Sequence, residues 1–310
     1  MIQEPMDILR QYPVRKSKEQ KQNFRRDVKN YATSFGYGCR EEKGSFGVRN
    51  LVIGNPEKAK VLITAHYDTC AALPFPNLIT PCNFLPFLGY QVLVIVILLA
   101  AAILVGVLVG VLTASVDIGY WCGYLSFWVF LVLMLVGPAN KTNANDNTSG
   151  VVTLLEIART LPENQRDKVC FILFDLEEAG LLGSAVYQKA HKQETDNQLV
   201  LNLDCVGDGD HIRLFPTKKL RKDSERLEAL RKICGSFGKK DIQLQERGFA
   251  VYPSDQRAFP YGVGICALRD SKAGLYMGRI HTKRDTILEQ TNVNLLRAAL
   301  TTFISQEGRQ

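Results

Sequence analysis

The chain has 310 residues, of which 46% are hydrophobic, and it carries a formal net charge of +7. This length allows one large domain or two modest ones and is ample to bury a core. Its eight cysteines form no CxxC pair, which argues against a thiolate zinc knuckle, and their scattered positions favour a reducing compartment over a disulfide framework.

The N-terminal part is predicted to be helical. Residues 17–36 combine charges with spaced apolar positions, which is the pattern of an amphipathic helix. Acidic residues interrupt the basic run from Arg15 to Lys29, and no aromatic stacking pattern accompanies it. We therefore interpret this run as the solvated face of the helix rather than a nucleic-acid site, with attraction to anionic lipid as a third interpretation. The first residues contain no apolar stretch of the kind found in signal peptides.

Two strands are predicted next in the chain. They cover residues 47–54 and 59–65 and are separated by a turn at Asn55-Pro56. The second is nearly all apolar, as expected for an interior strand that is covered on both faces.

The composition then changes over residues 71–140, where Asp117 is the only charged residue. Two apolar runs, residues 91–114 and 118–137, each have about the length needed to cross a hydrocarbon core. A pair of buried helices in a soluble domain is the alternative. Two such runs in tandem favour a transmembrane hairpin.

The packing and orientation of this hairpin can also be predicted. Gly106 and Gly110 have the GxxxG spacing that lets two membrane helices approach closely. A hairpin returns the chain to the side it left. We expect that side to be cytoplasmic, because no export signal precedes the hairpin, Lys141 follows it and its turn has no basic residue. A transporter is not favoured, because the runs hold no internal ionisable residue that marks an ion path.

After residue 140 the predicted helices and strands alternate. The helices cover residues 148–160, 180–192, 224–235 and 294–305, and the strands cover residues 168–174, 199–203 and 265–268. This alternation predicts an α/β fold, a three-layer sandwich with a central, mostly parallel mixed sheet flanked by helices.

The chain is accordingly divided into two structural units. Residues 1–83 and 138–310 form one discontinuous domain, in which residues 1–37 are an N-terminal helical segment. Residues 84–137 form the inserted hairpin.

Histidines and carboxylates follow closely on several apolar strands. They are His66, Asp68, Asp146, Glu177, Glu178, Asp204 and His281. Open α/β sheets place their sites at the carboxyl ends of strands. Each residue alone has a structural explanation, such as a helix cap, a partner of a helix dipole or a turn residue. The functional interpretation rests on their occurrence together.

This set of residue types suits the hydrolysis of a peptide bond. Two metal ions about 3.5–4 Å apart acidify a bridging water and polarise the carbonyl group. Imidazole and carboxylate ligands suit zinc, and one carboxylate can bridge two cations. A further carboxylate beside the metals can take the proton of the water and pass it to the leaving amine.

The ordered motifs HYDT, NDN, EExGLxGS, NLD and HTxxDT resemble those of the co-catalytic zinc aminopeptidase family. This family includes bacterial leucyl-type aminopeptidases and has glutamate carboxypeptidases and glutaminyl cyclases as relatives. The resemblance covers residues 20–80 and 140–305, and residues 177–184 are its most specific part. It implies a zinc peptidase domain that removes N-terminal residues from peptides with a free N-terminus, and the inserted hairpin is expected to anchor this domain to a membrane.

The resemblance also implies which residues hold two zinc ions. Asp146 would bridge both ions. His66 and Asp204 would complete one metal site, and Glu178 and His281 the other.

Two further roles follow from the same resemblance. Glu177 would be the general base, and Asp68 would orient the imidazole of His66. Gln256 stands where many relatives carry histidine, so no role is assigned to it. The stretch from the first histidine to the bridging aspartate is short in soluble relatives, whereas here it contains the hairpin.

Three alternatives stay open. Glutaminyl cyclases share this scaffold, but they use one zinc ion and usually lack the GLxGS continuation. A carboxypeptidase needs basic residues for the terminal carboxylate of its substrate, for which Arg257 and Arg269 are candidates. A non-catalytic membrane scaffold normally lacks some of the metal ligands, and here none is missing.

Overall fold

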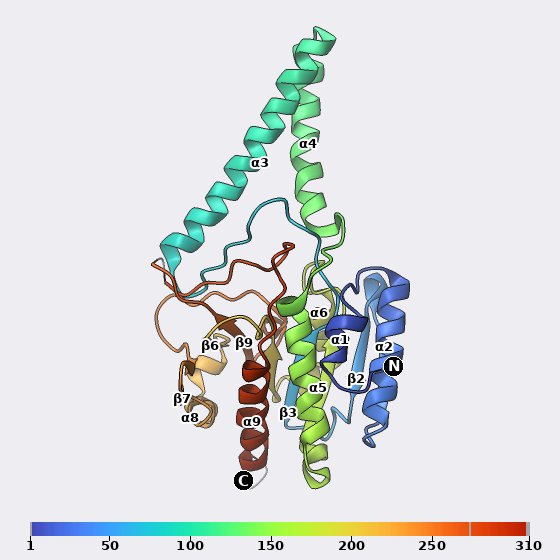
Figure 1. The fold of residues 1–310 in the computed structure, drawn as a ribbon, viewed down its shortest axis with the longest axis vertical. Coiled ribbons are helices and arrows are strands. Elements are labelled where there is room, and N and C mark those ends of the chain that lie inside the picture. Colours follow the sequence, from blue (N-terminus) through green and yellow to red (C-terminus); the bar gives the residue numbers. More distant parts are fainter. Residues whose placement is uncertain (1, 273, 308–310) are drawn as a thin grey trace.

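The computed structural model describes residues 2–272 and 274–307. In this part of the chain, one sheet of nine strands forms the centre of the body, in the order β1-β2-β4-β3-β5-β9-β6-β8-β7 (Figure 1). The strands are β1 (Cys39–Lys43), β2 (Arg49–Ile53), β3 (Val61–His66), β4 (Val169–Phe174), β5 (Leu199–Leu203), β6 (His211–Pro216), β7 (Gly235–Phe237), β8 (Lys240–Leu244) and β9 (Gly262–Leu268). The central strands β4-β3-β5-β9 are parallel, and antiparallel pairs flank them.

Helices cover both faces of this sheet. The helices of the body are α1 (Asp7–Gln11), α2 (Lys18–Thr33), α5 (Gly150–Thr160), α6 (Leu182–Ala190), α7 (Lys192–Thr195), α8 (Ser224–Arg231) and α9 (Gln290–Glu307). Successive residues of a strand point to opposite faces. Phe171 accordingly packs in a cluster with residues of α2, α5, α8 and α9, whereas Ile172 packs in a cluster with α6. The predicted three-layer α/β fold is confirmed.

Short turns connect these elements. They are η1 (Ser45–Gly47), η2 (Ala144–Ser149), η3 (Glu163–Lys168), η4 (Leu220–Lys222) and η5 (Asp255–Ala258). The start of α2 is fixed by a capping box, in which the Ser17 hydroxyl accepts from the Gln20 amide and the Gln20 side chain accepts from the Ser17 amide.

The strands β1, β6, β7 and β8 were not predicted from the sequence. The helix predicted over residues 224–235 is shorter, because α8 ends at Arg231 and Gly235 already belongs to β7. The interpretation of the basic run as solvated is wrong at two positions, since Arg15 and Arg25 are 0% and 3% exposed.

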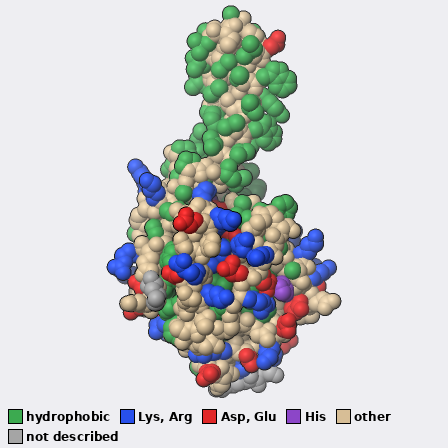
Figure 2. Space-filling view, turned by 90° about the vertical axis from the view of Figure 1, so that its right-hand side faces the viewer, with side chains coloured by type: hydrophobic (Ala, Val, Ile, Leu, Met, Phe, Trp, Pro, Cys, Tyr) green, Lys and Arg blue, Asp and Glu red, His purple; other side chains and the backbone are tan. Residues whose placement is uncertain are grey.

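The two apolar runs form the helices α3 (Phe84–Thr113) and α4 (Val116–Val136), which project together from the body (Figure 1). Charged side chains gather on the body, whereas the surface of the projecting pair is largely hydrophobic (Figure 2). The predicted close approach is confirmed. A Cβ atom at Gly119 would lie 2.6 Å from the Gly106 carbonyl oxygen and 2.9 Å from the Gly110 Cα.

Candidate metal centre

Three neighbouring parallel strands deliver side chains to one edge of the sheet. His66 is the last residue of β3, Glu177 and Glu178 follow β4, and Asp204 follows β5. Because the carboxyl ends of parallel strands meet at the same edge, these four side chains converge there.

Asp146 and His281 reach this edge from two loops. Asp146 lies in η2, where its backbone departs from helical geometry, and His281 lies in the segment between β9 and α9. Asp285 fixes the first of these loops, because its carboxylate oxygens accept hydrogen bonds from the Asn145 amide at 2.7 Å and the Asp146 amide at 3.0 Å.

The Asp146 carboxylate lies between the two histidines. Its Oδ1 is 3.3 Å from the His66 Nε2, and its Oδ2 is 3.0 Å from the His281 Nε2. Each histidine also faces a second carboxylate, with 3.5 Å from His66 Nε2 to Asp204 Oδ1 and 3.4 Å from His281 Nε2 to Glu178 Oε2. One carboxylate thus separates two imidazole–carboxylate pairs.

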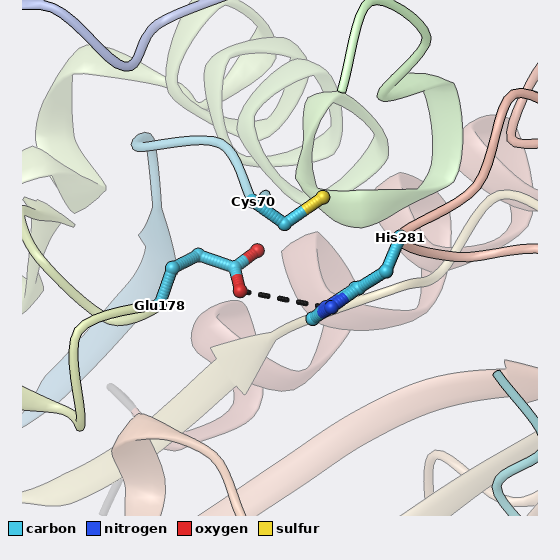
Figure 3. A group of neighbouring side chains, drawn as sticks. All are labelled: Cys70, Glu178 and His281. Atoms are coloured by element: carbon cyan, nitrogen blue, oxygen red, sulfur yellow. Dashed lines mark ion pairs between the residues drawn. The ribbon is translucent and has the colours of Figure 1, made fainter. Parts of the chain in front are cut away.

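Several overlapping groups of side chains at this edge bring potential ligand atoms within 4.8 Å of one another. One group is His66, Asp146 and Glu178, and another is His66, Glu177 and Asp204. Glu178 and His281 point toward each other across a third group, with Cys70 beside them (Figure 3). The Cys70 thiol donates to Asn143 Oδ1 at 3.3 Å, and burial raises its pKa well above its usual range.

The residues present fit a bound cation. Glu178 Oε1 and Asp204 Oδ1 are buried and accept no hydrogen bond from the described residues, and for Asp204 Oδ1 the 3.5 Å approach of His66 Nε2 is a charge contact only. Burial raises the pKa of the Glu178 carboxyl to about 8. Burial lowers the pKa of His281, but Glu178 and Asp146 outweigh this effect and raise it to about 9. Imidazole nitrogens with carboxylate oxygens form the type of donor set that zinc prefers.

Glu177 lies at the same edge, and its pKa is also shifted. Burial raises the pKa of its carboxyl well above the usual range, and Glu178 and Asp204 add to the rise while His66 opposes it. A carboxyl group with a raised pKa beside metal-binding side chains is typical of a general base or acid.

Asp68 organises the loop that carries both glutamates. Its Oδ1 accepts from the Glu177 amide at 3.1 Å, and its Oδ2 accepts from the Glu178 amide at 3.2 Å. The His66 Nδ1 lies 3.2 Å from the backbone oxygen of Asp68 and 3.5 Å from its carboxylate. The backbone carbonyl therefore makes the shorter contact with the imidazole.

A buried arginine beneath the site was missed by the sequence analysis. Arg15 donates from its guanidinium to the backbone oxygens of Tyr67 and Tyr12 and, at 3.1 Å, to the Thr148 hydroxyl. Burial lowers its pKa to about 10, against the attraction of Asp68 and Asp146. It links the segments that carry His66 and Asp146, and its place in a basic run gave no sign of this role.

Two buried aspartates were also given no role. Burial raises the pKa of Asp285 to about 7, with a further contribution from Asp146, and burial raises that of Asp255 to about 7. Asp285 belongs to the quoted HTxxDT motif, so its motif was the available signal. Asp255 is the first residue of η5, and its carboxyl interacts electrostatically with His66 and Asp204. It directly precedes Gln256, to which the sequence analysis assigned no role.

Comparison with known proteins shows the family to which the chain belongs. The sequence profile of peptidase family M28 matches residues 131–304, which is more than half of the chain. A stretch of 67 residues is 45% identical to aminopeptidase YwaD of Bacillus subtilis and covers 21% of this chain and 15% of that protein. A stretch of 174 residues is 29% identical to leucine aminopeptidase 1 of Ajellomyces dermatitidis and covers 51% of this chain and 44% of that protein. The matched stretches thus span less than half of the length of either relative.

Solved structures share the fold over nearly the whole chain. A glutaminyl cyclase of Porphyromonas gingivalis has a TM-score of 0.62 at 15% identity, covering 98% of this chain and 96% of that chain. A Zn-dependent exopeptidase from Parabacteroides distasonis has a TM-score of 0.61 at 15% identity, covering 97% and 94%. At this identity the likeness concerns the fold alone. Because the family profile spans more than half of its residues, the chain belongs to peptidase family M28.

Proposed function

We propose that this protein is a membrane-anchored, zinc-dependent aminopeptidase that hydrolyses N-terminal residues from peptides. The observation that carries the proposal is the Asp146 carboxylate, whose two oxygens face His66 and His281 separately. This arrangement suits a carboxylate that bridges two metal ions. The aminopeptidases similar in sequence support the choice of reaction.

The proposed ligands divide into two sets that share Asp146. His66 and Asp204 belong to one set, and Glu178 and His281 belong to the other. When bound, zinc would supply a water nucleophile at neutral pH and polarise the scissile carbonyl group. We therefore propose that each chain binds two zinc ions.

Glu177 is the proposed general base. Its carboxylate takes a proton from the attacking water and then donates that proton to the nitrogen of the leaving amine. Asp68 positions this base, because it holds the amides of Glu177 and Glu178 in place. Arg15 and Asp285 hold the segments that carry His66 and Asp146.

The membrane anchor is proposed from α3 and α4. Both helices are long and apolar enough to cross a membrane, by length and composition. Only 17% and 6% of their most apolar stretches are buried, unlike the core helices of a soluble protein. Strands from before and after the hairpin, such as β3 and β4, pair in one sheet, so both flanks lie on the same side. We propose that this side is cytoplasmic.

Two measurements on membranes test the anchor and its orientation. We expect alkaline carbonate to leave the protein in the membrane, and protease added outside intact cells to leave the body uncut. Release by carbonate would contradict the anchor. Cleavage of the body in intact cells would contradict only the orientation.

The catalytic assignment is tested with matched glutamate variants. Glu177→Gln is expected to lower kcat by about 10²–10⁴-fold while the metal content is unchanged, because the base is removed and the ligands stay. His281→Ala is expected to lower both kcat and the metal content, because it removes a proposed ligand. Glu163→Gln, in the distant η3, serves as the control and should change neither. Full activity of Glu177→Gln would contradict the assignment.

A glutaminyl cyclase is the second candidate, because such an enzyme shares the fold over nearly the whole chain. A cyclase acts on an N-terminal glutamine without releasing an amino acid. Cyclisation of a glutaminyl peptide with no release of amino acids would replace the aminopeptidase proposal.

A further inference from the structure

A cavity of about 610 Å³ lies where α3 leaves the body. One wall comes from the first turns of α3 and the preceding segment, and the opposite wall comes from the segment between β9 and α9. The residues that carry the argument are Leu93, Ile97, Arg269, Arg279 and Arg284.

The wall formed by α3 is apolar and uncovered. Leu93 is 53% exposed and Ile97 is 42% exposed, although both belong to an apolar helix. Near the foot of the same helix, the Tyr90 hydroxyl donates to the Pro76 backbone oxygen at 2.6 Å, which fixes the helix against the loop before it. An acyl chain or another apolar group would cover this wall.

The opposite wall carries an excess of positive charge. Arg279 contacts Asp208 at 3.1 Å, and Arg269 contacts the same carboxylate at 3.7 Å. Arg284 is exposed and has no ion pair with an acidic residue among residues 2–272 and 274–307. The Asp208 carboxylate therefore contacts two of the three guanidinium groups that line this cavity, and Arg284 is left without an acidic partner among the described residues.

Further basic side chains stand at the same end of the body. The Lys16 ammonium donates to the Leu135 backbone oxygen at 3.2 Å, near the end of α4, and Lys141 is exposed a few residues beyond that helix. Cationic groups thus lie at the feet of both α3 and α4. Clusters of this kind beside a membrane segment attract anionic headgroups.

We propose that this cavity binds one anionic phospholipid. The phosphate of the headgroup meets Arg269 and Arg284, and one acyl chain lies along Leu93 and Ile97. Arginine suits this position because its planar fork can donate two hydrogen bonds to one phosphate. The inference rests on the proposed insertion of α3 and α4 into a membrane.

The test is native mass spectrometry of the full-length, detergent-purified protein with equal amounts of phosphatidylglycerol and phosphatidylcholine of identical acyl chains. We expect a one-to-one phosphatidylglycerol adduct, favoured over phosphatidylcholine by about tenfold, because basic residues at a membrane surface attract anionic lipid. The double variant Arg269→Gln with Arg284→Gln should lose this preference. Arg297→Gln, on the distant helix α9, is the matched control and should keep it.

A second variant probes the apolar wall without changing any charge. Leu93→Trp fills the space along α3 and should reduce retention of both lipids while the arginines stay in place. Equal retention of the two lipids by the unmodified protein would overturn the proposal. An unchanged preference for phosphatidylglycerol in the double arginine variant would also overturn the proposal.

A peptide carboxylate is the competing occupant, because Arg284 also lines a neighbouring cavity of about 520 Å³ beside Thr282. An increased KM for free peptides in the double variant, with the lipid preference unchanged, would assign these arginines to the substrate. Failure of membrane insertion is measured separately by carbonate extraction. An inserted, active protein without lipid preference contradicts only the lipid site.

Discussion

Two apolar helical regions of this protein meet opposite surroundings. In α5, every residue from Gly150 to Ala158 is buried between the sheet and neighbouring helices. In α3, only Val94, Leu98 and Ala102 are buried, and most of the other apolar side chains are exposed. Apolar composition alone therefore does not show whether a helix lies in the core, whereas the exposure of its side chains does.

The largest expected effect comes from a charge in the buried helix. Leu154 in α5 is 0% exposed, so Leu154→Asp removes buried apolar area and places a carboxylate without a partner in the core. We expect a loss of more than about 5 kcal/mol in the free energy of unfolding. Urea unfolding followed by far-ultraviolet circular dichroism measures this loss. A loss below about 1 kcal/mol in the free energy of unfolding would contradict the assignment of Leu154 to the core.

The buried arginine should give the next largest effect. Arg15→Met removes the donors for the Tyr67 and Tyr12 backbone oxygens and should destabilise the body by about 3–5 kcal/mol. The matched control is Arg10→Met, because the Arg10 side chain is 84% exposed. Thermal unfolding measures the stability of both variants. Equal stability would mean that Arg15 does not link the segments that carry His66 and Asp146.

A charge in the projecting helix tests the other side of the comparison. Leu108 in α3 is 58% exposed, so Leu108→Asp would be nearly neutral in water. In a bilayer, the same change should oppose insertion by about 2.5–3.5 kcal/mol. The fraction of protein that resists carbonate extraction measures this effect, with Leu108→Ile as the control. Unchanged extraction of the aspartate variant would indicate that this part of α3 lies outside the hydrocarbon.

Zinc should stabilise the body, by about 2.7 kcal/mol at a free concentration of 100 times its Kd. Uptake should also release protons. Against the effect of burial, Glu178 and Asp146 raise the pKa of His281, and burial raises the pKa of Glu178, so this pair holds at least one proton at pH 7 that zinc must displace. The apparent affinity should therefore rise from pH 7 to pH 9. Calorimetry in two buffers of different ionisation enthalpy counts the protons, and a count of zero would contradict these assignments.

The strands that could be predicted from the sequence are those whose residues are mostly apolar. The strands β3, β4 and β5 are mostly apolar and were predicted, because both of their faces are covered. The edge strand β1 reads CREEK and is largely exposed, so its polar residues resemble a loop. The strands β6 and β8 mix charged and apolar residues and gave no clear alternation.

The candidate site shows a similar limit. The proposed ligands were found because histidines and carboxylates followed strands in an ordered set of motifs. Arg15 was not found, because its importance comes from distant partners such as Tyr67 and Thr148 that only the fold brings together. Asp285 stood in the HTxxDT motif, but the motif did not indicate that its carboxylate accepts hydrogen bonds from the backbone amides of Asn145 and Asp146.

The most direct test of the central claim is amino-acid release from a short peptide by the detergent-purified, full-length protein. The peptide is supplied with its N-terminus either free or acetylated. An aminopeptidase should release amino acids only from the free form, and this activity should disappear with chelator and return with zinc. Release from neither form by protein that carries its full metal content would contradict the account.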